Sequence, residues 1–531
     1  MNVFVIAVFA SLIVYLVVGY FVGRNVKNVD DYYVAGRSAP VFLIVGSLVA
    51  SYISTGAFLG ETGETASGAF MPVMIVGVMQ CTGYLFGSNL FGRYIRRSQC
   101  LTIPEYFGAR FQSVRMRKLS AIIMVISVTA YMLSVTQGIS TLMSSLTGMS
   151  YKSCVVIAWA SFTIFTIWSG SPGVLVTDTM MFCVFIVAAV IAIPSVFINV
   201  GGWDTAIANL ANSTDVPGII SATGSPEYIA STGQTTLWAI FYGVVWIFVV
   251  MISPWQTSRY MMAKDEHVVM RSAIWASLGV IITTSCLYFT GAFITLKAPG
   301  LGTETIIYAS FNMMPRIVGV VLLTGILAAG ISSGSTFLSL CGFAVTNDLF
   351  IKKDKTDEKS LLRFSRNGML VVSLCVLVMA YFNPPAIFWV MYFGGAVIAG
   401  SWALVSISSI WSKNISEKGA FYGMLLGFIG CFFTRLGEAL GFFTIPTMWL
   451  DSFAVGIYLS VIGVLAGNKL SAPTAAEIAE RKKMFVVPES EKDPVRMWKT
   501  YRLWRVYACF AFLFAIIMVT KYAIPYLNAL R

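Results

Sequence analysis

Long apolar runs recur from one end of this 531-residue chain to the other, and they constrain its fold more than any other feature. A helix needs about 20 apolar residues to span the roughly 30 Å hydrocarbon layer of a membrane. Only 11% of the residues are charged, against about 25% in soluble domains. Strands of a membrane barrel would instead alternate apolar and polar residues over about 10 positions. The sequence therefore predicts an all-α polytopic membrane protein.

The apolar runs predict about 14 transmembrane helices. Their expected positions are about 2–22, 38–66, 69–93, 119–146, 151–170, 174–201, 236–255, 272–297, 315–348, 361–382, 386–410, 419–438, 445–466 and 503–527. The basic residues gather in loops on one predicted side, in the clusters 93–118, 352–366 and 469–505, whereas the loop 202–235 has no Lys or Arg. By the positive-inside rule, these clusters are cytoplasmic and both termini lie outside a bacterial-type inner membrane. The net charge of +12 then reflects topology and indicates no nucleic-acid partner.

Two predicted spans contain interruptions at matching places. The second carries Ser54, Thr55 and Gly56 in mid-membrane, and the seventh carries Ser253-Pro254, five spans later. Paired broken helices are typical of transporters built from inverted repeats. We expect an additional helix and loop at 1–37, five-helix repeats at 38–201 and 236–410, an external loop at 202–235, and three further helices at 411–531 with a cytoplasmic loop at 467–502.

Several motifs resemble those of the sodium/solute symporter family in order and spacing. They are DYYVAGRS at 31–38, LTIPEYFGARF at 101–111, TDT at 177–179, SRYMMAKD at 258–265 and ILAAGISS at 326–333. The resemblance covers about residues 20–466 and implies a LeuT-type core of 5+5 inverted repeats. Details elsewhere look closest to the pantothenate and monocarboxylate branch.

The resemblance implies a sodium site between the second and ninth spans. Carried over by position, its ligands are the backbone carbonyls of Ala50, Ile53 and Ala329 and the hydroxyls of Ser332 and Ser333. Such a site suits a hard cation, because an unwound helix supplies carbonyl oxygens without intrahelical partners. Alternatively, the two serines bond carbonyls of their own helix.

A second sodium site is implied only for some family members. Asp178 matches the aspartate involved, with Ser335 and Thr336 as possible partners, but Met180 stands near where the family usually has a glutamine. A structural role for Asp178, or a place on the exit path of sodium, is the alternative.

The family pocket lies beside the sodium. Its expected solute-binding residues here are Ser54, Thr55, Gly56, Gln80, Gln137, Trp246, Ser253, Trp389 and Tyr392. Each aromatic residue among them could equally be helix packing. Glu61 and Glu64 have no counterpart in the resembling families; an outer vestibule in contact with water, a proton-coupling site or a partner for a cationic solute group are the options. His267 is expected in water on the cytoplasmic side.

The resemblance implies a sodium symporter that imports a small organic solute, with membrane lipid around it and no obligate protein partner. We expect a carboxylate such as a monocarboxylate or a pantothenate-like compound. The alternatives are a proton-coupled transporter of amino acids or other small solutes on the same fold, and a non-transporting solute sensor. We expect no enzyme and no cofactor, because the sequence lacks a metal cluster, a nucleophile elbow and a phosphate-binding loop.

Overall fold

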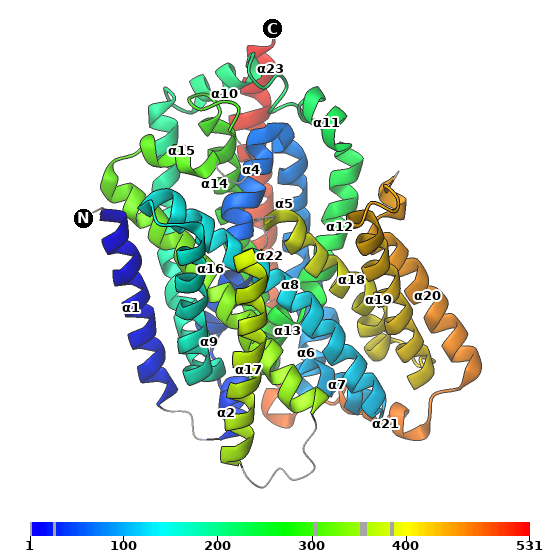
Figure 1. Ribbon diagram of the computed structural model, residues 1–531. Helices are drawn as coiled ribbons and strands as arrows, with labels where there is room; N and C mark the ends of the chain where they lie inside the picture. The colour runs from blue at the N-terminus through cyan, green and yellow to red at the C-terminus, as the bar shows by residue number, and fades with distance from the viewer. Residues whose placement is uncertain (1–2, 25–27, 302–305, 351–357, 383–386, 446) are drawn as a thin grey trace.

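The computed structural model describes the whole chain except residues 1–2, 25–27, 302–305, 351–357, 383–386 and 446 (Figure 1). The described residues form helices and connecting loops without a β-strand. Twelve of their helices are long and apolar enough to cross a membrane. The all-α fold is therefore confirmed, whereas the predicted count of fourteen spans is not, because two further apolar helices are shorter than a membrane crossing.

The order of the elements is as follows. The helices are α1 Val3–Gly23, α2 Val29–Val34, α3 Val41–Tyr52, α4 Thr62–Glu64, α5 Phe70–Phe86, α6 Arg93–Arg97, α7 Ile103–Arg110, α8 Val114–Thr147, α9 Tyr151–Asn199, α10 Trp203–Ala211, α11 Pro226–Thr232, α12 Thr236–Ile252, α13 Pro254–Met262, α14 Glu266–Ile294, α15 Ile306–Asn312, α16 Arg316–Phe343, α17 Glu358–Phe382, α18 Ile387–Trp411, α19 Glu417–Ala439, α20 Ser452–Leu470, α21 Ala475–Lys483, α22 Pro494–Met518 and α23 Ile524–Ala529. Short π-helical turns include η2 Gly56–Glu61, η3 Thr65–Ala69, η4 Gly87–Gly92, η5 Ala344–Leu349 and η8 Val519–Ala523.

Both predicted helix interruptions are present. α3 ends at Tyr52, and π-helical turns continue the span after Thr55. Ser253 separates α12 from α13 with an extended ψ of 145°, and Pro254 opens the second piece. Proline suits this first helical position because it has no N–H to leave unpaired.

Two sharp bends connect neighbouring spans without a loop. Gly68 has a φ of +121° and turns the chain from the outer half of the broken helix into α5. Gly170 has a φ of +57° inside α9, where the fifth predicted span gives way to the sixth. A side chain would be strained at either angle, so glycine allows these turns.

The interior is formed by the helices on either side of the α3 break. α3 packs against α9, α13, α14 and α16, while α16 also packs against α8 and α9. Their facing side chains are buried, as the 0% exposure of Ala50, Asp178 and Ser333 illustrates. The candidate functional site therefore lies where α3, α9, α13 and α16 meet.

The two ends of the bundle differ in character. In Figure 1, α10, α11, α15 and the C-terminus lie at the top, and α2, α7 and α21 at the bottom. The bottom holds buried ion pairs, among them Arg96–Glu491 at 2.9 Å and Arg117–Asp348 at 2.7 Å. His267 belongs to this end, and the expectation that it lies in water was wrong: it is fully buried, with Nε2 3.0 Å from the Glu491 carbonyl. Which end faces the cytoplasm stays a prediction.

Candidate functional site

The break after α3 leaves carbonyl oxygens without intrahelical partners. The Ile53 N–H donates to the Val49 carbonyl at 2.8 Å, and the next backbone bond of the span runs from the Ala57 N–H to the Ser54 carbonyl at 3.1 Å. The last four carbonyls of a helix lack i+4 donors. The carbonyl of Ala50 belongs to this group, and so does that of the capping residue Ile53. This part of the chain is buried in protein, where a membrane protein tolerates such backbone because it is kept away from lipid.

A serine of α16 reaches this backbone. Ser333 Oγ donates to the Ala50 carbonyl oxygen, 3.3 Å away. Ala329 and Ser332 lie four and one residues before Ser333, and all three are fully buried. Four-residue spacing places Ala329 and Ser333 on one helix face. The structure thus brings Ala50 and Ser333 together, beside Ala329 and Ser332.

Ser332 instead contacts α9. Its Oγ donates to Asp178 Oδ1 at 2.6 Å. Neither serine therefore makes only the local helix bond that was the alternative. Ser335, in contrast, makes a local bond to its own helix, because its Oγ donates to the Ser332 carbonyl at 2.8 Å.

Asp178 is held in a buried network of four elements. Its Oδ2 accepts from Ser47 Oγ of α3 at 2.5 Å and pairs with Arg259 Nη2 of α13 at 3.0 Å. Arg259 Nε also donates to Ser47 Oγ at 2.8 Å, and its Nη2 donates to Thr336. Because Arg259 offsets the charge of Asp178, this carboxylate is already neutralised without a cation. Thr336 belongs to the network only through the hydrogen bond that it accepts from Arg259.

Sequence reasoning missed Arg259 and Ser47. Arg259 stands in the motif 258–265, but it follows a predicted span that ends at about residue 255, so the sequence places it in a loop. The structure folds it inward on α13, where its side chain is 1% exposed. The signal that could have found it is the Pro254 helix start, because a new buried helix after the break carries its polar residues into the bundle.

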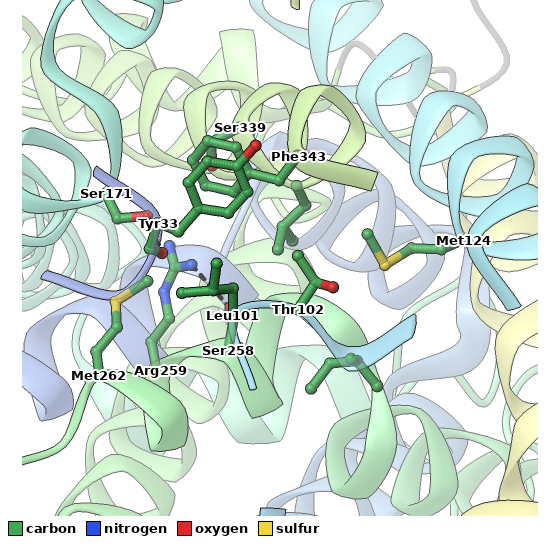
Figure 2. Close-up of a pocket in the computed structure, with 12 residues that line it drawn as sticks. Tyr33, Leu101, Thr102, Met124, Ser171, Ser258, Arg259, Met262, Ser339 and Phe343 are labelled. Carbon is green, nitrogen blue, oxygen red and sulfur yellow. Dashed lines mark hydrogen bonds between the residues drawn. The ribbon is translucent and has the colours of Figure 1, made fainter. Parts of the chain in front are cut away.

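A small cavity lies below this network. It has a volume of about 10 Å³, room for about one water molecule. Figure 2 shows Arg259 and Ser258 of α13 beside it, with Tyr33 of α2, Thr102 of the α6–α7 loop and Ser339 of α16. Arg259 therefore contacts Asp178 and also lines the cavity toward the basic end of the bundle.

Three expected solute-binding residues, Gln80, Trp246 and Tyr392, come together on the other side of the break. Tyr52 donates to Gln80 Oε1 on α5, and its ring lies 6.0 Å from that of Trp246 on α12. The Tyr392 ring of α18 lies 4.9 Å from Tyr242, which in turn contacts Trp246. These rings form one aromatic cluster around the broken helix.

Several buried polar atoms at this level have no hydrogen-bond partner among the described residues, among them the Tyr242 hydroxyl and Trp246 Nε1 of the aromatic cluster. The group also includes the amide nitrogen Nε2 of Gln80 and the hydroxyl of Ser253, both on residues that are 0% exposed. A buried polar group without a partner costs about 1–3 kcal/mol. Such groups suit a site whose partner is a solute or a water molecule.

The remaining expected residues are more scattered. Thr55 Oγ1 donates to the Val135 carbonyl of α8 at 3.4 Å, and Ser54 Oγ accepts from the Gly56 N–H at 3.1 Å. Gln137 of α8 is buried. Trp389 differs: it contacts Tyr392 at 6.2 Å but is 42% exposed. The structure does not bring Trp389 into the buried group.

Glu61 and Glu64 occupy the outer half of the broken helix. Glu61 is only 6% exposed and accepts from Tyr288 of α14 at 2.6 Å, which rules out a water-filled vestibule around it. Glu64 accepts from Tyr228 of α11 at 2.5 Å. Neither acid forms an ion pair with the described part of the chain.

Comparison with known proteins bears on the whole arrangement. The sequence model of the Sodium:solute symporter family matches residues 32–427, which contain the break, Asp178, Arg259 and both serines. The chain belongs to the sodium:solute symporter family. Members of this family are membrane transporters. The family membership that the motifs predict is confirmed.

Relatives in the family include symporters for proline and symporters for pantothenate. The sodium/proline symporter of Salmonella typhimurium is 25% identical over 484 residues, which cover 87% of this chain and 92% of the relative. The sodium/pantothenate symporter of Escherichia coli is 23% identical over 467 residues, covering 85% and 93%. A solved Na+-coupled sialic acid symporter has a TM-score of 0.74 at 18% identity, covering 89% of this chain and 98% of that one. This likeness confirms the LeuT-type fold of this sodium:solute symporter.

Proposed function

We propose that this chain imports a small organic carboxylate together with one sodium ion, which binds between α3 and α16. The observation that carries this proposal is the contact of Ser333 Oγ with the Ala50 carbonyl across the helix break. It brings together two oxygens that the family resemblance assigns to sodium. A hard cation prefers several such oxygens, uncharged or charged.

Hydrogen-bond chemistry supports an ion shell of Ala50, Ile53, Ala329, Ser332 and Ser333. A hydroxyl has one proton to donate and two lone pairs to offer. Because Ser332 gives its proton to Asp178, its lone pairs stay available for a cation. Ser333 can turn its lone pairs toward an ion when the ion takes over the Ala50 carbonyl.

Asp178 acts next to this shell as a positioning residue and as the start of the inner exit path. Its charge is balanced by Arg259, so a second sodium there would meet a nearby guanidinium. Coulomb repulsion between like charges in a low-dielectric interior opposes that arrangement. A single sodium ion passing Asp178 on its way toward the cavity of Figure 2 fits this charge balance better.

The solute stands beside the broken helix. Gln80 Nε2 and Ser253 Oγ supply polar contacts for a carboxylate, close to the N-terminal end of the outer half-helix. Helix N-termini favour anions, so no buried arginine is needed. The rings of Tyr52 and Trp246 cover the apolar part of the solute.

The membrane potential drives accumulation when a net charge moves inward. One charge gains about 2.3 kcal/mol per 100 mV, equivalent to roughly 50-fold accumulation. A monovalent carboxylate with one sodium would carry no net charge and would depend on the sodium gradient alone. The response of uptake to voltage therefore reports the charge of the solute once the sodium number is known.

One observation favours proton coupling as the second candidate. Glu61 is a buried intramembrane carboxylate with Tyr288 as its hydrogen-bond partner and no basic partner among the described residues. Intramembrane acids of this kind carry protons in many transporters. Glu61 could load and release a proton as the outer half of the broken helix moves.

Uptake into proteoliposomes decides between the two. A mixture of carboxylic acids, amino acids and pantothenate is offered with an inward sodium gradient, then with potassium in its place. We expect uptake with sodium only, unaffected by a protonophore when the voltage is clamped. Uptake that follows the pH gradient and ignores sodium would replace the proposal by proton coupling through Glu61.

A further inference from the structure

Two arginines stand on a pair of stacked aromatic rings at the lower end of α1. The rings of Tyr20 on α1 and Trp168 on α9 are 5.8 Å apart and inclined by 21°. The Arg24 guanidinium lies 6.0 Å from the centre of the Tyr20 ring, and the Arg366 guanidinium of α17 lies 5.6 Å from that of Trp168. Aromatic faces attract guanidinium groups, so the rings hold both cations at one place.

An apolar groove runs from these rings along α1 and α9. Its volume is about 530 Å³, and its lining residues are Leu16, Val17, Tyr20, Phe21, Ile164 and Trp168. The groove opens at the surface, since Phe21 and Ile164 are each 59% exposed. From Leu16 to Arg24, helical rise gives about 12 Å, close to the half-thickness of a hydrocarbon layer of about 30 Å. Such a groove has the dimensions of an acyl chain.

Within the described part of the chain, no acidic side chain neutralises either cation: Arg24 and Arg366 form no ion pair there. Arg366 Nε is also buried without a hydrogen-bond acceptor in the same part of the chain. The arginine ends therefore offer positive charge and N–H donors to an anion at the mouth of the groove.

The position of the arginines fits the level of lipid headgroups. Figure 1 shows α1 ending near α2 and the lower end of α17. Arg366 belongs to one of the basic clusters that we expect on the cytoplasmic side. Basic pockets between helices on that side bind acidic headgroups.

We propose that Arg24 and Arg366, with the groove between α1 and α9, form a binding site for one acidic phospholipid. The phosphodiester accepts hydrogen bonds from both guanidinium groups, in the paired geometry that arginine favours with phosphate. One acyl chain lies in the groove against Val17 and Ile164. A soluble anion would leave the groove uncovered, and an uncharged lipid would leave the two cations unpaired.

Native mass spectrometry of the full, delipidated chain tests this site. The probes are phosphatidylglycerol and phosphatidylcholine with identical acyl chains. At about 1 kcal/mol per basic residue, we expect the wild type to prefer phosphatidylglycerol by roughly 30-fold. The double variant Arg24→Gln/Arg366→Gln should lose this preference and keep its affinity for phosphatidylcholine.

Arg435→Gln is the matched control. Arg435 stands over the exposed ring of Trp389 in the same manner, 5.1 Å from its centre, but Glu438 neutralises it. Its removal should leave the lipid preference unchanged. Equal binding of both lipids by the wild type, or an equal loss of preference in both variants, overturns the proposal.

A second measurement needs no variant and so does not depend on folding. Phosphatidylglycerol with a photoreactive acyl chain should crosslink to residues 16–21 and 164–168. Crosslinks that lie mainly in the larger apolar groove lined by Phe42, Trp275 and Phe510 would overturn the assignment. Inorganic phosphate at about 10 mM, where the Debye length is still on the order of 20–30 Å and close charges are hardly screened, should not displace the lipid; displacement would identify a free-anion site instead.

Discussion

Ser332 on α16 and Asp178 on α9 are joined by a hydrogen bond of 2.6 Å, donated by the serine hydroxyl. The same carboxylate pairs with Arg259 through its other oxygen. The sodium ligand proposed on α16 is therefore oriented by a buried charge pair between α9 and α13. This link makes Asp178 a residue that acts through Ser332.

The variant Asp178→Asn tests the positioning role. The amide keeps the size but no longer balances Arg259, and the acceptor that orients Ser332 is weakened. We expect a higher sodium concentration for half-maximal uptake and an unchanged sodium-to-solute ratio, measured by comparing the uptake of labelled sodium with that of labelled solute over a range of sodium gradients. A changed ratio would show that Asp178 holds a second sodium after all.

The buried pair itself predicts a stability pattern. Removal of one partner of a buried pair costs about 3–5 kcal/mol, because it leaves the other charge uncompensated. Arg259→Gln and Asp178→Asn should each lower the thermal midpoint of the purified protein more than the double variant does. Additive losses in the double variant would mean that the two side chains are not energetically coupled.

Much of this arrangement is predictable from the sequence, for physical reasons. Apolar runs have to match the thickness of a membrane, and Ser54-Thr55-Gly56 marks a helix that cannot continue unbroken. The burial of Arg259 and Glu61, in contrast, could not be predicted from the sequence. Arg259 follows a predicted span and Glu61 lies near the end of one, and only the folding of α13 and of the outer half-helix against their neighbours takes them out of water. Pairing partners such as Ser47 lie far away in sequence and carry no local signal.

The solute site predicts different roles for two tryptophans. Trp246 is 1% exposed and contacts Tyr52, whereas Trp389 is 42% exposed. Trp246→Leu should raise the KM for the solute by about tenfold or more, since loss of one well-buried contact of 1.4 kcal/mol already gives this factor. Trp389→Leu should leave the KM near the wild-type value. Equal effects of the two variants in uptake assays would contradict this placement of the solute.

Proton coupling can be separated from sodium coupling at Glu61. Because Glu61→Gln keeps the hydrogen bond to Tyr288 but cannot exchange a proton, sodium-driven uptake should persist with an unchanged pH profile. Tyr288→Phe serves as the matched variant, which removes the partner and leaves the acid in place. A pH dependence that disappears in the Gln variant alone would assign proton transfer to Glu61.

The contact between the α13–α14 loop and α22 should contribute to stability in a pH-dependent way. Burial alone would raise the pKa of Asp265, but its hydrogen bonds with Arg496 and the Val268 N–H outweigh that effect and lower the pKa. A lowered folded-state pKa stabilises the protein above the unfolded value of about 3.9 and loses this contribution as the pH falls through the folded value. Arg496→Gln should cost up to about 1 kcal/mol near pH 7, and the difference from wild type should vanish in acid. A thermal-shift series that shows a constant difference would contradict this sign.

The most direct test of the central claim is the sodium dependence of uptake in Ser333→Ala. Thr324→Ala is the matched control on the same helix, since the Thr324 hydroxyl donates only to the Val320 carbonyl of its own helix, at 2.8 Å. A contact to a charged group contributes about 1.5–3 kcal/mol, so the sodium concentration for half-maximal uptake should rise about 10- to 100-fold in Ser333→Ala. It should stay at the wild-type value in Thr324→Ala. Wild-type sodium dependence in a well-folded Ser333→Ala protein would contradict a sodium site between α3 and α16.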